Sequence, residues 1–127
     1  MPAAPGNISQ EPVSARTLVA VYLALAVLTW MVFGQTLGYP FVQYDDQDYV
    51  YENPEITAGL TSHGLLTAFS GHHARNWHPL TTISHMLDCQ LFGLDPAGHH
   101  FSSVLFHTLA TLLLFGVLRA MTGALWR

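Results

Sequence analysis

Two adjacent aspartates, Asp45 and Asp46, are the residues of this sequence that most readily suggest chemistry. They lie in segment 41–54, FVQYDDQDYVYENP, which holds four of the eight carboxylates together with three tyrosines. One carboxylate of such a pair can act as a general base while the other orients it or binds a metal, because close like charges raise one pKa. The alternative is a solvated acidic loop, and two residues alone do not decide between these interpretations.

The eight histidines raise the question of a metal site, but their spacing matches no ligand pattern. No HExxH motif occurs, and His78 and His85 would lie two turns apart on a helix, about 10 Å by helix rise. We therefore predict no metal ligands and no obligatory cofactor, and we leave open a divalent cation at the carboxylates. The single cysteine, Cys89, excludes an internal disulfide and a cysteine-based zinc site. His107 is expected to hydrogen-bond to a neighbouring span, with a proton relay as the alternative.

Three aromatic residues accompany the acidic segment and the histidines. Tyr49, Tyr51 and Trp77 could stack on a sugar ring. They could equally anchor the chain at a membrane interface, where tyrosine and tryptophan are enriched.

The composition indicates a membrane protein. Hydrophobic residues make up 50% of the 127 positions and charged residues only 9%, whereas soluble domains carry roughly 25% charged residues. The four basic residues are all arginines and do not cluster, so the chain lacks the basic patch that a nucleic-acid backbone requires. Nucleic acid is therefore excluded as a partner.

Two apolar segments are long enough to cross a bilayer. Residues 17–38 would extend roughly 33 Å as a helix, against a hydrocarbon core of about 30 Å. Gly38 and Pro40 then stop this helix. A cleaved signal peptide is the rival interpretation, which the length of the segment and the lack of a small-residue cleavage motif disfavour. Residues 96–121 form the second segment, with Asp95 as a good N-cap.

Between these spans, residues 39–95 are expected to form an extracytoplasmic loop with short helices at about 61–69 and 79–92. Gly64 is expected to weaken the first of these helices. The second has an apolar stripe at helical spacing, and its polar side chains lie away from that stripe. The stripe comprises Leu80, Ile83, Leu87 and Leu91, while Thr81, Thr82, His85, Asp88 and Cys89 lie elsewhere. This helix should lie along the membrane surface or pack against other spans.

The arginines suggest an orientation. Arg16 precedes the first span, Arg119 and Arg127 follow the second, and the loop between holds seven carboxylates. The positive-inside rule then puts both termini in the cytoplasm, and we expect a bacterial inner membrane with a periplasmic loop. Residues 1–16 would be a disordered cytoplasmic tail and 122–127 a cytoplasmic end. The expected fold is an all-α membrane protein with two transmembrane helices joined by a long extracytoplasmic loop carrying an amphipathic interfacial helix.

The ordered segments FVQYDDQDYVYENPEITAGL and NWHPLTTISHMLDCQLFGLDPAGHHFSSVLFHTLATLLLF resemble the amino-terminal part of a membrane glycosyltransferase family. These are GT-C-type proteins with a multi-span domain followed by tetratricopeptide repeats, and they include the transmembrane O-mannosyltransferases and bacterial relatives. The similarity runs from about Thr17 to Gly123. It implies part of a GT-C multi-span fold whose first extracytoplasmic loop works on a lipid-phosphate-linked sugar.

The resemblance also implies roles for individual residues. Asp45 and Asp46 match the paired acids of the family and would be the catalytic residues. The positions implied in substrate binding are Asn53, Trp77, His78, His99 and His100. The implied partners are membrane lipid, a polyprenyl-phosphate-linked sugar donor and a hydroxyl-bearing acceptor on a protein or glycan.

Because the remaining spans and the repeats of the family are missing from these 127 residues, we expect a fragment that is inactive alone. The alternative from a different class is a non-catalytic two-span membrane protein whose acidic, histidine-bearing loop binds a partner. A loop that handles heavy metals is a further alternative, suggested by the histidine count only.

Overall fold

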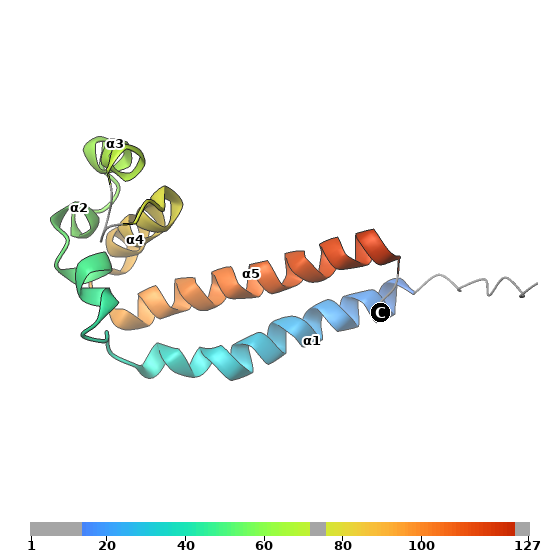
Figure 1. The fold of residues 1–127 in the computed structure, drawn as a ribbon. Coiled ribbons are helices and arrows are strands. Elements are labelled where there is room, and N and C mark those ends of the chain that lie inside the picture. The colour runs from blue at the N-terminus through green and yellow to red at the C-terminus, as the bar shows by residue number, and fades with distance from the viewer. Residues whose placement is uncertain (1–13, 72–75, 124–127) are drawn as a thin grey trace, which may run out of the picture.

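The computed structural model describes residues 14–71 and 76–123, and the regular elements within them are helices. In order they are α1 (Ala15–Phe33), η1 (Gly34–Gly38), η2 (Gln47–Tyr51), α2 (Pro54–Thr57), α3 (Ser62–Ser70), α4 (Pro79–Phe92) and α5 (Pro96–Thr122). The long helices α1 and α5 lie side by side, and the short elements from η2 to α4 form a helical lobe at one end of this hairpin (Figure 1). Nearly all of the expected tail, residues 1–13, and the end 124–127 lie outside the described residues.

Two stretches are long and apolar enough to cross a membrane. They are Ala15–Gly38, with 24 residues, and Pro96–Thr122, with 27 residues. Only 6% and 11% of their apolar windows are buried inside the molecule, which is unlike the core helix of a soluble protein. The span expected at 17–38 corresponds to α1 followed by the 3₁₀ turn η1. The chain is therefore all-α with two candidate spans.

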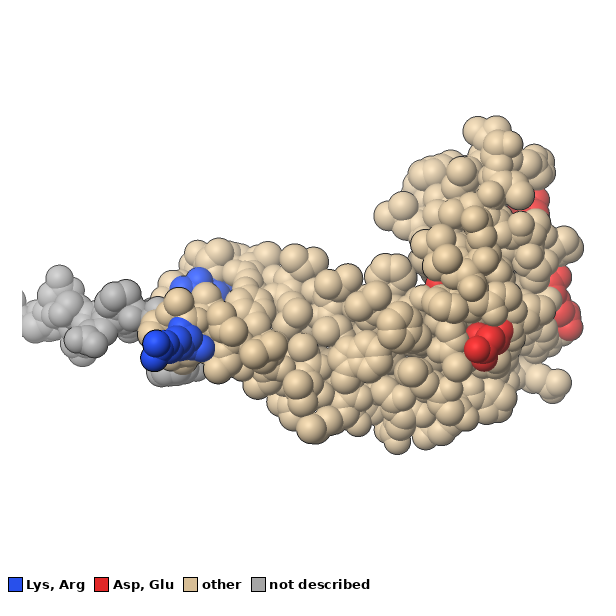
Figure 2. All heavy atoms as spheres, turned by 180° about the vertical axis from the view of Figure 1, so that it is seen from behind, with Lys and Arg blue, Asp and Glu red and all other residues tan. Residues whose placement is uncertain are grey.

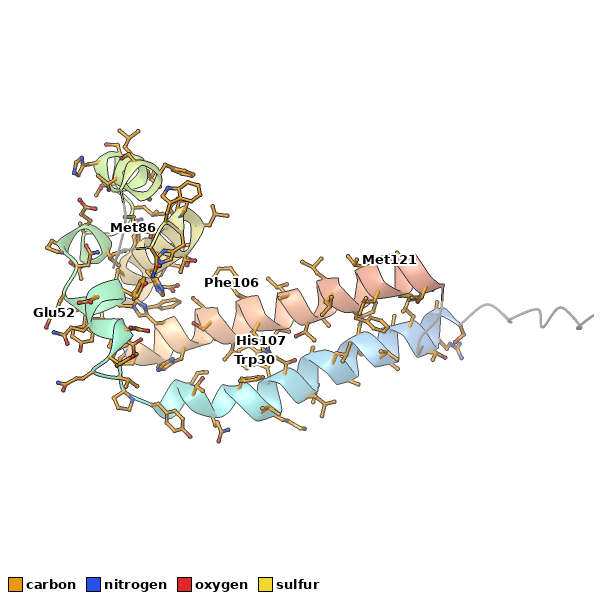
Figure 3. The ribbon with its side chains drawn as sticks, viewed as in Figure 1. Trp30, Glu52, Met86, Phe106, His107 and Met121 are labelled. Carbon is orange, nitrogen blue, oxygen red and sulfur yellow. The ribbon has the colours of Figure 1, made fainter. Side chains whose placement is uncertain are left out.

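Aromatic rings hold α1 against α5. The pairs are Tyr22 with Phe115, Trp30 with Phe101 and Phe33 with His107, at centroid distances of 5.0, 5.6 and 4.6 Å. Figure 3 shows Trp30 and His107 between the two helices. At Gly116 an added Cβ would come within 2.9 Å of the Tyr22 hydroxyl, so the small residue lets the tyrosine lie close.

The acidic segment is helical from Asp45 to Tyr51, where the sequence predicted no helix. Asp45 and Asp46 begin a helical turn that continues as the π-helix η2. Asn53 then caps α2, with its side-chain oxygen accepting from the Glu55 backbone N–H at 3.0 Å. An Asn cap followed by proline at the first helical position is a strong start signal, and the buried Ile56 anchors the short helix.

The helix expected at 61–69 corresponds to α3. The Thr61 hydroxyl caps it by accepting from the Gly64 backbone N–H at 2.9 Å. Gly64, expected to weaken this helix, is buried against α4, where a Cβ would lie 3.0 Å from the Met86 terminal methyl group. The missing side chain therefore lets α3 approach the fully buried Met86, labelled within the lobe in Figure 3.

Helix α4 has the bounds expected from the sequence, but its polar face is the buried one. Among the buried residues of α4 are Thr82, Asp88 and Cys89. The leucines of the expected stripe are exposed, with Leu80 at 75% and Leu91 at 63%. A helix of a soluble domain would bury this stripe. Its exposure supports the expectation that lipid or further spans cover it.

A charge on that stripe is expected to harm membrane assembly. Leu80→Asp should cost on the order of a few kcal/mol if lipid or protein covers the site. Thr81→Asp, at the exposed polar position next to it, is the matched control. The two are compared by the fraction of protein that elutes as one species after detergent extraction. Equal yields would show that the stripe does not face an apolar environment.

Candidate functional site

Charge is segregated among the described residues. The arginine side chains drawn there lie at the end where α1 begins and α5 ends, and the carboxylates drawn there lie at the lobe end (Figure 2). The acidic residues are thus concentrated on the same part of the chain as most of the histidines.

The paired aspartates differ in their surroundings. Asp46 is half-buried, and its Oδ2 accepts a hydrogen bond from the Val42 backbone N–H at 2.8 Å. Asp45 is exposed. One acid of the pair therefore fixes the turn before η2, and the other is accessible from solvent.

The segment before α4 is tied to the rest of the lobe by two aromatic residues. The Tyr49 hydroxyl accepts from the Asn76 side-chain amide at 2.7 Å, and the Tyr49 ring lies 5.2 Å from that of His78. The Trp77 indole N–H donates to the Phe69 carbonyl at 3.0 Å, yet the residue is 60% exposed. This geometry fits both alternatives for Trp77, a sugar platform and an interfacial anchor.

His99 and His100, at the start of α5, have different surroundings. Phe41 contacts both rings, at centroid distances of 5.3 Å to His99 and 6.4 Å to His100. His99 is buried. His100 lines a hollow of about 280 Å³ between α5 and the end of the first span, together with Phe33, Thr36, Ser103, Val104 and His107.

His99 meets two residues of α4, His85 and Asp88, that were not among the site residues expected from the sequence. We name His85, Asp88 and His99 the α4–α5 cluster; one potential ligand atom of each lies within 4.8 Å of the others. His85 and Asp88 are three positions apart and so share a face of α4. That spacing was a usable signal. It was missed because His85 was compared only with His78 and was not paired with Asp88.

Hydrogen bonds hold this cluster in place. The Ser102 hydroxyl donates to Asp88 Oδ1 at 2.6 Å, which joins α4 to α5. His99 Nε2 lies 3.0 Å from the Gly93 carbonyl oxygen, in the turn between the helices. The rings of His85 and His99 are stacked with centroids 6.4 Å apart.

The acidic motif lies within electrostatic range of the cluster. Burial lowers the pKa of the His85 imidazole below its ordinary value; the charges of Asp88 and Asp46 oppose this shift, and those of His99 and His78 add to it. The neutral form of His85 is thereby favoured. Of the residues implied by the resemblance, His99 stacks on His85, and the charges of Asp46 and His78 act on the His85 pKa. Asn53 is engaged at the start of α2 and Trp77 is bonded to α3.

Fold and site together define an all-α chain with two candidate membrane spans and an acidic, histidine-bearing helical lobe between them. This chain is a distant homologue of the protein O-mannosyl-transferases Tmtc1 and Tmtc2. The resemblance expected from the acidic and histidine motifs is thereby confirmed.

The similarity covers most of this chain and little of its relatives. Tmtc1 of Drosophila melanogaster is 31% identical over 104 residues, which are 76% of this chain and 12% of that protein. Tmtc2 of the same species is 30% identical over 108 residues, and tmtc2 of Xenopus laevis is 30% identical over 110. These two matches cover 78% and 80% of this chain but 11% and 13% of the relatives. No family model and no solved structure matches the chain.

Proposed function

We propose that this chain supplies a membrane-embedded part of a glycosyltransferase that moves a sugar from a polyprenyl-phosphate donor to a hydroxyl acceptor. The observation that carries the proposal is the homology to proteins named as O-mannosyl-transferases, which makes mannose the first sugar to test. Because the chain spans 12% of Tmtc1, the activity is proposed for a complete protein that contains this segment.

In the proposed reaction, a carboxylate of the acidic pair removes the proton from the acceptor hydroxyl. The acceptor oxygen attacks the anomeric carbon of the sugar, and the bond from that carbon to the phosphate oxygen breaks. The lipid phosphate leaves with the bonding electrons. The exposure of Asp45 supports it as the base, and the Val42 hydrogen bond of Asp46 supports a positioning role for that residue.

The position of the acids relative to the spans supports a lipid-linked donor. Asp45 follows the end of η1 at Gly38 by a few residues, so it would lie near the membrane surface if Ala15–Gly38 spans. The anomeric carbon of a polyprenyl-phosphate sugar lies at headgroup height. His78, His100 and the exposed face of Trp77 are proposed to contact the donor or the acceptor, with Asn53 and the buried His99 shaping the site.

The function is tested by reconstituting the complete protein in liposomes with polyprenyl-phosphate mannose and an acceptor peptide. Transfer from the lipid-linked donor, and not from a nucleotide sugar, is expected. A correctly inserted protein that transfers from neither donor would favour the alternative of a partner-binding membrane hairpin.

We also predict that the lobe is extracytoplasmic and both ends of the hairpin are cytoplasmic. Native Cys89 is a poor reporter, because it is buried, and burial together with the Asp88 charge raises the pKa of its thiol. In a Cys89→Ala background, Tyr44→Cys should react with an impermeant maleimide in intact cells, since Tyr44 is exposed in the lobe region. Ser14→Cys, at the other end, should react only after permeabilisation. The reverse pattern would overturn the topology.

A further inference from the structure

The α4–α5 cluster has a buried nitrogen whose surroundings are unusual for a histidine. His99 Nε2 lies 3.0 Å from a carbonyl oxygen, and a carbonyl only accepts, so Nε2 carries the proton. In the neutral ring, Nδ1 then presents a lone pair. Among the described residues this buried Nδ1 has no hydrogen-bond partner, and neither does the buried Nδ1 of His85.

The lone pair of His99 is close to a second acceptor. Asp88 Oδ2 lies 3.9 Å from His99 Nδ1, and the two side chains are only 8% and 5% exposed. A hydrogen bond cannot span that distance, because N–H···O contacts measure about 2.7–3.2 Å. Two ligand atoms that each lie about 2.1 Å from one metal ion are separated by roughly 3 to 4.2 Å. The 3.9 Å separation therefore suits a shared cation better than a shared proton.

The outer contacts also match those of a metal ligand set. A ligating histidine usually donates its other ring N–H to a carbonyl or carboxylate, as His99 does to Gly93, and ligating carboxylates are hydrogen-bonded, as Asp88 is by Ser102. His85 supplies a second imidazole, whose buried Nδ1 has no hydrogen-bond partner among the described residues. The ligand atoms of the cluster lie within 4.8 Å of one another. Side-chain shifts of about an ångström would bring them to the separation of atoms that bind one metal ion.

The donor set identifies the class of metal. Two imidazoles and one carboxylate suit zinc and related first-row divalent ions, whereas calcium and magnesium prefer oxygen ligands alone. Cys89 is excluded as a ligand, because it belongs to the apolar core of the lobe with Val50, Ile56 and Met86.

We propose that His85, Asp88 and His99 form a binding site for a zinc-like divalent transition-metal ion that fastens α4 to the first turn of α5. The open positions left by three protein ligands are filled by solvent or a further group. Metal binding at this site does not depend on sugar transfer, so the experiment that tests it is independent of the proposed function.

Binding is tested with Co²⁺, whose visible absorption reports coordination, on the 127-residue chain purified in detergent without a histidine tag. One Co²⁺ per chain is expected, displaced by Zn²⁺ and without the near-ultraviolet thiolate band that Cys89 would produce. His85→Gln and Asp88→Asn should each weaken binding at least about tenfold. Ser102→Ala should weaken it by about tenfold to a hundredfold through the lost outer contact.

His63→Gln is the matched control. His63 Nε2 also lies 3.9 Å from a carboxylate oxygen, that of Glu55, but its side chain is 79% exposed. Its substitution should leave Co²⁺ affinity unchanged. The proposal would be overturned if the wild-type chain showed no saturable one-to-one Co²⁺ binding. It would also be overturned if binding survived in both His85→Gln and Asp88→Asn, or if His63→Gln lost as much Co²⁺ affinity as they do.

A second measurement covers variants that fold poorly. Zn²⁺ should raise the thermal unfolding midpoint of the wild type and of His63→Gln, and a chelator should reverse the increase. An equal increase in His85→Gln, checked for helical content by circular dichroism, would contradict the site.

Discussion

Replacing Asp45 with asparagine is expected to slow sugar transfer by the complete protein by roughly a hundredfold or more, because a general base is lost while the side-chain size is kept. Asp46→Asn should have a comparable effect. Its carbonyl oxygen can still accept from the Val42 N–H, so the turn is preserved while the second charge of the pair is removed. Turnover is measured with a polyprenyl-phosphate mannose donor at equal amounts of inserted protein.

Two other acids in the lobe serve as controls for this experiment. Asp48→Asn and Glu55→Gln lie outside the paired motif and should be much milder. If both Asp45→Asn and Asp46→Asn keep near-normal turnover, the acidic segment is a solvated surface and not a catalytic one. If all four variants lose activity equally, general negative charge in the lobe matters, and the assignment of a base is wrong.

Gly98→Ala is expected to destabilise the junction of α4 and α5 by about 1–3 kcal/mol, the usual cost of overpacking. A Cβ at Gly98 would overlap Cγ of Phe92, the last residue of α4, and would lie 2.5 Å from its Cβ. The contact cannot be relieved at the end of a flexible side chain, so the helices must move apart. The first turn of α5, with His99, would then move away from Asp88.

Gly38→Ala is the matched control, since nothing lies within 4 Å of a Cβ added there and its φ needs no glycine. Thermal unfolding in detergent, followed by circular dichroism, compares the two variants. Gly98→Ala should melt clearly below Gly38→Ala. Matching melting curves would mean that the turn between α4 and α5 is loose.

Local signals in the sequence predicted the helices well. Pro79 and Gly93 bound α4, and Asp95 caps α5 through the Ala97 N–H at 3.1 Å. These signals depend on neighbouring residues alone, so no tertiary information was needed. The acidic segment was harder, because charge density suggested a loop, while Asn53 and the buried Ile56 produce short helices that depend on packing against α4.

Only part of the candidate site could be predicted from the sequence, because the rest also depends on how the helices pack. The acidic pair and the histidines of α5 were found by resemblance, but Asp88 and His85 were missed. Periodicity identifies an apolar stripe without telling which side of the helix meets the rest of the chain. In water the stripe turns inward, whereas in this chain its leucines are exposed, so periodicity alone could not show that Asp88 and His85 face His99.

The inverted face of α4 has a consequence for protein engineering. Helix α4 exposes the leucines of its apolar stripe and keeps the hydroxyl of Thr82, the carboxylate of Asp88 and the thiol of Cys89 inside. Excised from the hairpin and expressed in the cytosol, the lobe would behave as an aggregation-prone peptide and not as a miniature domain. A water-soluble version would need polar substitutions at the exposed Leu80, Leu87 and Leu91 and no change to the buried residues. That is the opposite of the usual practice in redesign, where the interior is rebuilt and the exterior is spared.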